Sequence, residues 1–367
     1  MRRDPQSRPA SGLSPASRRA TIALLAAAAA VGLLLSACSG SGSTAASSSP
    51  PASSPSTSAA RPSTPAASSQ SATASDTSEP VNPIAENVDI GGGRSIYVEC
   101  QGEGSPTVLL LSGGGTASDL WHAPGQVPNV YDTIGTQTRV CAWDRPGVQY
   151  LDGTPSRSTA VPQPITPQDA ADDLTAILDK LDMHGPYVLV AHSFAGNIAR
   201  VFAGENADDV KGIVFVDVLS PELRAQMTPE QWATWVTTNN RSPALIAAYP
   251  DLEQYDFNVS LDQVDAAEKL RPMPVVVLTA SVKFADLVPE YIDEGLVPAD
   301  TPRDFGSVID RTNSAAQAVI AGYFPGSEHI TDTNSGHNIM VENAAVVIKA
   351  TEDVIAAVDA GRTTVTG

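Results

Sequence analysis

The stretch from Tyr187 to Gly196 has the composition of a strand, a tight turn and the start of a helix. The apolar run Tyr187 to Ala191 leads to Ser193, and the residues two positions before and after that serine are small, Ala191 and Ala195. A serine at the tip of such a turn is held at strained backbone angles with its hydroxyl exposed, and larger neighbours would collide with the strand and the helix. Ser193 is therefore the candidate nucleophile.

The elements that must hold this turn alternate along the chain beyond Pro80, with short β-rich runs separated by helical segments. Such alternation predicts a mostly parallel sheet covered on both faces. Thr166 to Leu181 has apolar residues at helical spacing after a Thr-Pro start and predicts a helix. Strands are predicted at Ser95–Gln101, Thr107–Ser112, Arg139–Trp143, Tyr187–Ala191, Gly212–Asp217, Val275–Thr279 and Ser327–Asp332.

Three motifs in this order resemble those of the α/β-hydrolases. The turn at Ser193 resembles their nucleophile elbow, with alanines in place of the usual glycines. Asn334-Ser335-Gly336-His337, followed by a helical run, resembles their catalytic-histidine loop. Leu111-Ser112-Gly113-Gly114-Gly115 resembles the loop after their third strand, although the family usually has His-Gly where this chain has Ser-Gly.

The resemblance covers about residues 84 to 360 and implies the α/β-hydrolase fold. This is an eight-stranded, mostly parallel sheet flanked by helices. A small helical cap is expected after the sixth strand, at residues 221–274, within a hydrolase domain of residues 81–367. Trp232 and Trp235 of this cap either line a substrate pocket or pack against the main domain.

The resemblance also implies roles for individual residues. His337 would be the base that takes the Ser193 proton, and the Gly114 and Phe194 N–H groups would form the oxyanion hole. His192, inside the turn, is expected to point away from the serine in a structural role. The remaining histidines are His122, His184 and His329.

The acid of the triad has two candidates. In most relatives it follows the seventh strand, where the first carboxylate of this chain is Asp286. In the haloalkane-dehalogenase branch it ends the sixth strand, where this chain has Asp217. Asp217 is the first choice, because a carboxylate that ends an apolar strand needs a partner such as imidazolium; the alternative is that it caps the turn that follows.

Two further features follow from the fold. Cys141 to Gly147 resembles the segment in which relatives carry Asp-Arg-x-Gly, so Asp144 and Arg145 are expected to brace loops around the site. Because the second and fourth strands are neighbours in this fold, Cys100 and Cys141 are candidates for a disulfide, the alternative being two buried free cysteines.

These residues together predict an acyl-enzyme serine hydrolase, most simply a carboxylesterase, with no metal or organic cofactor. Epoxide hydrolases and dehalogenases of this fold use an aspartate nucleophile, which the serine argues against. One alternative is an aminopeptidase of the proline iminopeptidase type, which needs a cap carboxylate for the substrate amine. Another is a catalytically silent, surface-tethered binding protein. Carboxylates available in the cap are Glu222, Glu230 and Glu253.

The first 38 residues predict an export signal. Five arginines precede an apolar run of 16 residues, Ala20 to Leu35, which is short for a transmembrane helix. Leu35-Ser36-Ala37-Cys38 resembles the lipobox of bacterial lipoproteins, so Cys38 is the predicted lipid attachment site; an ordinary secretion signal is the alternative, and the export route stays open. The chain would be a lipoprotein at the outer face of the cytoplasmic membrane.

Residues 39–80 predict a disordered tether, because 38 of these 42 residues are Ser, Thr, Ala, Pro or Gly. The full chain carries a net charge of −19, and removal of residues 1–38 would leave 17 basic and 40 acidic residues. A balance this acidic repels phosphate groups. The expected partner is therefore a small ester or amide substrate, with no nucleic acid and with membrane contact only through the lipid anchor.

Overall fold

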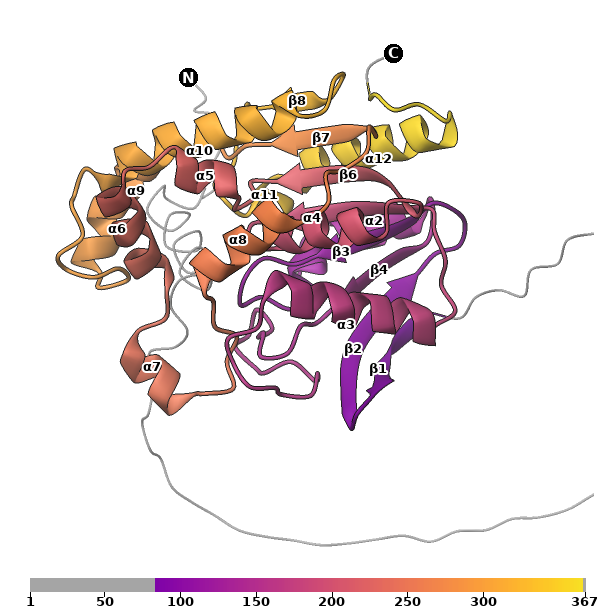
Figure 1. The fold of residues 1–367 in the computed structure, drawn as a ribbon, viewed down its shortest axis with the longest axis horizontal. Coiled ribbons are helices and arrows are strands. Elements are labelled where there is room, and N and C mark those ends of the chain that lie inside the picture. Colours follow the sequence, from indigo (N-terminus) through magenta and orange to yellow (C-terminus); the bar gives the residue numbers. More distant parts are fainter. Residues whose placement is uncertain (1–82, 366–367) are drawn as a thin grey trace, which may run out of the picture. The chain divides into compact units, whose positions relative to one another are not determined.

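The apolar runs of the sequence form adjacent strands of one sheet in a computed structural model that describes residues 83–365 (Figure 1). The order is β1-β2-β4-β3-β5-β6-β7-β8. From β4 to β8 neighbouring strands pair in parallel, and β2 pairs antiparallel with both β1 and β4. This confirms the predicted eight-stranded, mostly parallel sheet. The strands are β1 Ile84–Gly91, β2 Arg94–Gln101, β3 Thr107–Leu111, β4 Val140–Trp143, β5 Tyr187–His192, β6 Val210–Val216, β7 Val275–Leu278 and β8 Glu328–Ile330.

The predicted signal segment, Cys38 and the predicted tether lie outside the described residues. Strand β1 is absent from the runs singled out in the sequence. It is an edge strand whose side chains are mostly exposed, so it lacks the apolar run that marks the inner strands. Its hairpin to β2 turns through three successive glycines with positive φ, Gly91, Gly92 and Gly93.

Alternate residues of the parallel strands enter two separate cores, one on each face of the sheet. Leu109, Leu189 and Phe215 pack on one face with helices that include α3, α4 and α10. Val108 and Val190 pack on the other with α2, α11 and α12. The helices, including a 3₁₀ turn η1, are η1 Ser118–His122, α2 Val130–Gly135, α3 Pro167–Lys180, α4 Ala195–Glu205, α10 Phe305–Gly322, α11 Ile339–Glu342 and α12 Ala344–Asp359.

The segment between β6 and β7 contains four helices and, within the described residues, no strand. Thr228 begins α6 with a capping box in which the threonine hydroxyl accepts from the Gln231 N–H and the Gln231 side chain accepts from the Thr228 N–H. Helix α9 follows β7. The four helices between β6 and β7 are α5 Pro221–Ala225, α6 Pro229–Asn239, α7 Pro243–Ala248 and α8 Phe257–Ala266, and α9 is Phe284–Asp293.

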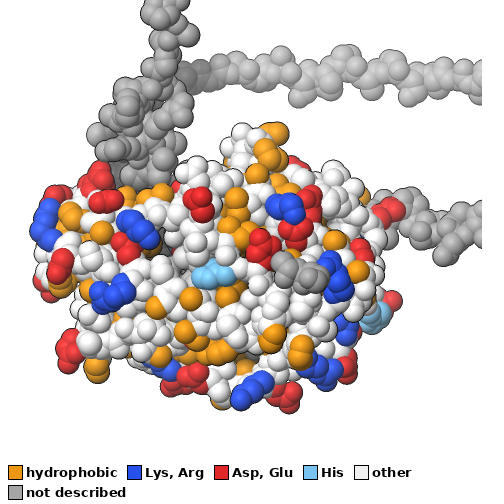
Figure 2. All heavy atoms as spheres, turned by 90° about the horizontal axis from the view of Figure 1, so that it is seen from above, with side chains coloured by type: hydrophobic (Ala, Val, Ile, Leu, Met, Phe, Trp, Pro, Cys, Tyr) orange, Lys and Arg blue, Asp and Glu red, His pale blue; other side chains and the backbone are white. Residues whose placement is uncertain are grey.

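The surface drawn in Figure 2 mixes side chains of both charges. Lysines and arginines are interspersed with acidic residues, and hydrophobic side chains are scattered between them. This is the usual composition of a solvent-exposed face. No helix in the described part of the chain is long and apolar enough to cross a membrane.

A disulfide joins Cys100 of β2 to Cys141 of β4. The two residues are directly opposite each other in the antiparallel pairing, with Cα atoms 4.1 Å apart. The bridge closes a covalent loop over a sequence separation of 41 residues. It therefore ties the antiparallel edge of the sheet to the strand that precedes Asp144 and Arg145.

Replacing both cysteines by alanine, Cys100→Ala with Cys141→Ala, should lower the free energy of unfolding by about 4 kcal/mol, because the unfolded chain loses a long cross-linked loop. The free energy of unfolding is measured by urea denaturation of the variant and of the wild type, the latter both oxidised and reduced. Reduced wild type is the matched control and should unfold near the midpoint of the variant. A variant as stable as oxidised wild type would contradict the prediction.

Candidate active site

The turn between β5 and α4 holds Ser193 in the left-handed region of backbone space, at φ 52°. Three backbone hydrogen bonds fix it there. The Ser193 N–H donates to the Val216 carbonyl at 3.1 Å, and the Ser193 carbonyl accepts from the N–H groups of Gly196 and Leu219, each at 3.0 Å. For a residue with a side chain this conformation costs on the order of 1–3 kcal/mol. The end of β6 and the segment after it therefore maintain the strained turn.

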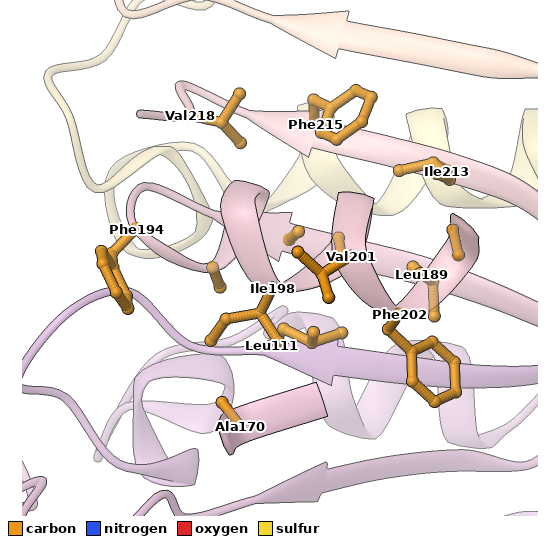
Figure 3. Close-up of a cluster of buried hydrophobic side chains, with 14 of the residues drawn as sticks. Leu111, Ala170, Leu189, Phe194, Ile198, Val201, Phe202, Ile213, Phe215 and Val218 are labelled. Atoms are coloured by element: carbon orange, nitrogen blue, oxygen red, sulfur yellow. The ribbon is translucent and has the colours of Figure 1, made fainter. Parts of the chain in front are cut away.

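Close packing explains the small residues around the serine. Ala191 and Ala195 are fully buried. A Cβ atom at Gly196 would lie 2.5 Å from the Val218 Cβ, so only glycine lets α4 approach the segment after β6 this closely. Figure 3 shows Ile198 and Phe202 of α4 near the sheet residues Leu111 and Leu189, and Val218 in the loop that follows β6.

Ser193, His337 and Asp217 form a continuous hydrogen-bonded line. The distance from Ser193 Oγ to His337 Nε2 is 2.9 Å, and that from His337 Nδ1 to Asp217 Oδ2 is 2.6 Å. The Asp217 side chain is 2% exposed and that of His337 is 31% exposed. With Nδ1–H donated to the carboxylate, Nε2 presents its lone pair to the serine hydroxyl. The imidazole can then take the serine proton while the carboxylate stabilises the imidazolium.

Asp217 reaches this line from the residue directly after β6. Its backbone is also in the left-handed region, at φ 45°, and its N–H donates to the Leu278 carbonyl at 2.8 Å. Its second oxygen, Oδ1, accepts from the Ala280 N–H at 3.1 Å and from Asn313 Nδ2 at 2.8 Å. Asp286, the alternative acid, lies exposed in the first turn of α9, away from this line of hydrogen bonds.

Two polar residues of α10 that the sequence analysis did not single out support the carboxylate. Gln317 Nε2 donates to the Asn313 Oδ1 at 3.1 Å and to the Val218 carbonyl at 2.7 Å. Gln317 is fully buried. It thereby orients the Asn313 amide so that Nδ2 faces Asp217. Their spacing of four residues, which places both side chains on one face of the helix, was the available signal.

The loop that carries His337 is fastened at several points. The Ser335 carbonyl accepts from the N–H groups of Ser281 and Val282, at 2.9 and 3.0 Å. The Gly336 N–H donates to Glu342 Oε2 of α11 at 2.8 Å. These bonds tie the loop to the segment after β7 and to the helix that follows.

His192 lies against the catalytic line rather than remote from it. Its Nε2–H donates to the His337 carbonyl at 3.1 Å, and the two rings are 4.6 Å apart between centroids. Burial, with a smaller contribution from His337, lowers the pKa of His192 well below its usual value. A neutral His192 places no competing cation beside His337, and its hydrogen bond connects the turn at Ser193 to the loop that carries His337.

Both predicted oxyanion donors lie at the end of the sheet that carries Ser193. Phe194 directly follows the nucleophile, and Gly114 follows β3, whose last residue Leu111 pairs with Ala191. In the described part of the chain neither the Gly114 N–H nor the Phe194 N–H donates to a protein acceptor. Both N–H groups thus lack an acceptor among the described residues, as donors of an oxyanion hole must.

Asp144 is fully buried and joins two loops through hydrogen bonds, as expected from the sequence. Its Oδ1 accepts from the Ser118 N–H at 2.7 Å, and its Oδ2 accepts from Ser156 Oγ at 2.9 Å. Burial raises the pKa of Asp144 above its usual value.

The three other histidines have separate partners: His122 pairs with Glu99, His184 with Asp182 and His329 with Thr279.

A family model and one structural superposition agree with this architecture. Residues 106–269 match the family model described as alpha/beta hydrolase fold. The crystal structure of a protein from Salmonella enterica described as a putative acyltransferase superposes with a TM-score of 0.50 at 15% identity, covering 75% of this chain and 96% of that one. A thermophilic esterase from Thermogutta terrifontis gives a TM-score of 0.45 at 18% identity, with 76% and 99% coverage. The chain has the α/β-hydrolase fold, as the sequence predicts.

Sequence relatives match over shorter spans. An uncharacterized protein of Schizosaccharomyces pombe is 36% identical over 146 residues, which is 33% of this chain and 26% of that protein. A haloalkane dehalogenase of Sphingobium indicum is 26% identical over 144 residues, 39% of this chain and 45% of the dehalogenase. The chain thus spans about a quarter of the first of these relatives and under half of the second.

Substituting the two candidate acids separates them. Asp217→Asn should slow covalent labelling of Ser193 by a fluorophosphonate by on the order of 10³-fold or more, because His337 loses the carboxylate that fixes its tautomer and its charge. The labelling rate is measured by mass spectrometry of the intact protein. Asp286→Asn, an equally conservative change, is the control and should react at the wild-type rate. Slow labelling of the Asp286 variant with a normal Asp217 variant would reverse the assignment.

Proposed function

We propose that this protein is a serine hydrolase that cleaves carboxylic esters of small molecules through an acyl-enzyme. The observation that carries the proposal is the hydrogen-bonded line from Asp217 through His337 to Ser193, which ends at a hydroxyl held on a strained turn. Two unpartnered amides, those of Gly114 and Phe194, supply the electrostatic half of the chemistry.

In the first half-reaction Ser193 Oγ attacks the ester carbonyl carbon as its proton passes to His337 Nε2. The carbonyl oxygen becomes an oxyanion and accepts hydrogen bonds from the Gly114 and Phe194 amides. Asp217 stabilises the imidazolium formed on His337. The tetrahedral intermediate then collapses, and His337 returns its proton to the departing alkoxide, which leaves as an alcohol with the acyl group on Ser193.

In the second half-reaction a water molecule replaces the alcohol. His337 Nε2 takes a proton from the water as its oxygen attacks the acyl carbon, and the same amides hold the new oxyanion. Collapse of this intermediate breaks the bond to Ser193 Oγ, which recovers the proton from His337. The product is a carboxylic acid, and the enzyme returns to its starting state.

The pairing of acidic residues supports an esterase over an aminopeptidase. Glu253 is fully buried in an ion pair with Arg145 at 2.6 Å, and Glu222 is paired with Arg200 at 2.8 Å. Glu230 is exposed in the first turn of α6. Two of the three carboxylates considered for binding a substrate amine therefore already neutralise arginines within the protein.

Removal of the serine hydroxyl tests the proposal. Ser193→Ala should lower the hydrolysis of p-nitrophenyl esters by about 10⁴-fold or more, because no nucleophile remains for the acyl-enzyme. The assay measures kcat/KM over a series of acyl-chain lengths and compares it with prolyl and alanyl anilides. Esters should be cleaved and anilides should not.

Three results would each contradict a different part of the proposal. Faster cleavage of prolyl anilides would establish the aminopeptidase alternative. Inert wild-type protein that fluorophosphonates do not label would favour the silent binding protein. Ester hydrolysis that persists in Ser193→Ala would place the chemistry at another residue.

We also propose that the protein is exported and anchored to the outer face of the cytoplasmic membrane by a lipid on Cys38. The support is the sequence of residues 1–38, in which arginines, an apolar run and Leu35-Ser36-Ala37-Cys38 occur in order. The Ser, Thr, Ala and Pro-rich stretch of residues 39–80 would then separate the hydrolase from the lipid surface.

In the native bacterial host, Cys38→Ser should move the protein from the detergent phase to the aqueous phase in a two-phase detergent partition, because the acyl chains that hold it in the membrane are lost. The immunoblot of both phases is the measurement. Ser47→Thr, outside the Leu35-Ser36-Ala37-Cys38 motif, is the control and should stay in the detergent phase. Wild type in the aqueous phase would indicate an ordinary secretion signal.

A further inference from the structure

We propose that Glu253 and Tyr255, from the segment between α7 and α8, are positioning residues that hold the oxyanion donors in place. The inference rests on the proposed serine-hydrolase function and extends it to residues outside the line of Ser193, His337 and Asp217. It starts from a buried ion pair that the reaction itself does not use, Arg145 with Glu253.

Arg145 fixes the direction of the Gly114 N–H. Its guanidinium is almost fully buried and donates to the carbonyls of Ser112 and Gly113, both at 2.7 Å. The Gly113 carbonyl and the Gly114 N–H belong to the same peptide group. Because that group is planar, with its C=O and N–H on opposite sides in the trans form, holding the carbonyl also aims the N–H.

Glu253 and Arg145 together form a clamp on the backbone of Gly113 to Gly115. Its Oε1 accepts from Arg145 Nε at 2.6 Å, and its Oε2 accepts from Arg145 Nη2 at 3.1 Å. The same Oε2 accepts from the Gly115 N–H at 2.5 Å. The two peptide groups that flank Gly114 are thus held by the two members of one ion pair.

Tyr255 joins this clamp to the second donor. Its hydroxyl donates to Glu253 Oε2 at 2.7 Å, and its ring lies 4.8 Å from the Phe194 ring between centroids. A Cβ atom at Gly114 would lie 2.8 Å from the Tyr255 Oη, so the tyrosine packs directly over the first donor as well. Burial and the Glu253 carboxylate raise the pKa of Tyr255 well above its usual value, which keeps the hydroxyl protonated as a donor.

The clamp residues are in turn fastened to the main domain and to the helices after β6. The Glu253 N–H donates to the Gly147 carbonyl at 2.9 Å, and Arg241 Nε donates to the Glu253 carbonyl at 2.8 Å. The Tyr255 ring stacks on Phe257 with centroids 5.3 Å apart.

Beyond Phe257 the aromatic contacts continue into α6, with Trp235 at 5.0 Å from Phe257 and Trp232 at 4.9 Å from Trp235. The aromatic side chains of the predicted cap therefore pack in a series that ends at the oxyanion donor Phe194. A displacement of these helices would reach the donors through Tyr255 and Glu253.

Tyr255→Phe is the sharpest test, because it removes one hydroxyl and keeps the ring against Phe194. With a p-nitrophenyl ester, kcat should fall by about 10-fold, a fraction of the loss expected when an oxyanion donor is deleted, and KM should stay within about twofold. The inhibition constant of an alkyl trifluoromethyl ketone should rise by a similar factor, because its hemiketal places an oxyanion in the same hole.

Tyr187→Phe is the matched control, since its hydroxyl donates to the Met183 carbonyl at 2.7 Å at the start of β5 and takes no part in the clamp. It should leave both constants unchanged. Glu253→Gln keeps the side-chain shape but leaves the Arg145 charge unbalanced, so a larger fall in kcat is expected wherever that variant folds. Tyr255→Phe keeps the test valid if Glu253→Gln does not fold.

The outcomes separate this inference from the function on which it rests. Wild-type kcat and ketone affinity in Tyr255→Phe, together with loss of activity in Ser193→Ala, would overturn the positioning role and leave the hydrolase intact. An increase in KM alone would place Tyr255 in substrate binding and would also overturn it. A wild-type protein inert toward esters and toward the ketone would overturn both.

Discussion

The hydrogen-bonded line from Asp217 through His337 to Ser193 is the constraint that the rest of the structure serves. Its members come from the carboxyl ends of β5 and β6 and from the loop after β8, and parallel strands bring those ends to one edge of the sheet. Ser193 and Asp217 both adopt positive φ, a strain that backbone hydrogen bonds from neighbouring strands offset. The register between the parallel strands therefore determines whether the three side chains come within hydrogen-bonding distance of one another.

The sequence predicted the parts of this arrangement that are local. An apolar strand leading into a serine between small residues is recognisable from ten consecutive positions, and the alternation of strands and helices predicted the sheet. Strand β1 was missed because its side chains are mostly exposed and carry no apolar run. The two acid candidates stayed open because relatives carry the acid after either the sixth or the seventh strand, and the hydrogen bond that distinguishes them joins Asp217 to His337 across 120 residues of sequence.

Contacts between distant segments account for what the sequence did not predict. Asn313 reaches Asp217 across 96 residues of sequence, and Glu253 reaches Arg145 across 108. Glu253 was considered as a ligand for a substrate amine because nothing near it in the sequence reveals its partner. Its burial beside Arg145 instead connects the helices after β6 to the loop after β3. The predicted cap thus has a structural connection to the catalytic edge of the sheet in addition to any part in substrate choice.

Trapping the covalent intermediate would show directly which residue carries the acyl group. Rapid mixing of wild-type protein with a p-nitrophenyl ester, an acid quench and peptide mass spectrometry would measure where the acyl group resides. We expect a mass increase equal to the acyl group on the peptide that contains Ser193, formed together with a burst of p-nitrophenol. Ester turnover accompanied by acylation of a different residue would contradict the role of Ser193 as nucleophile.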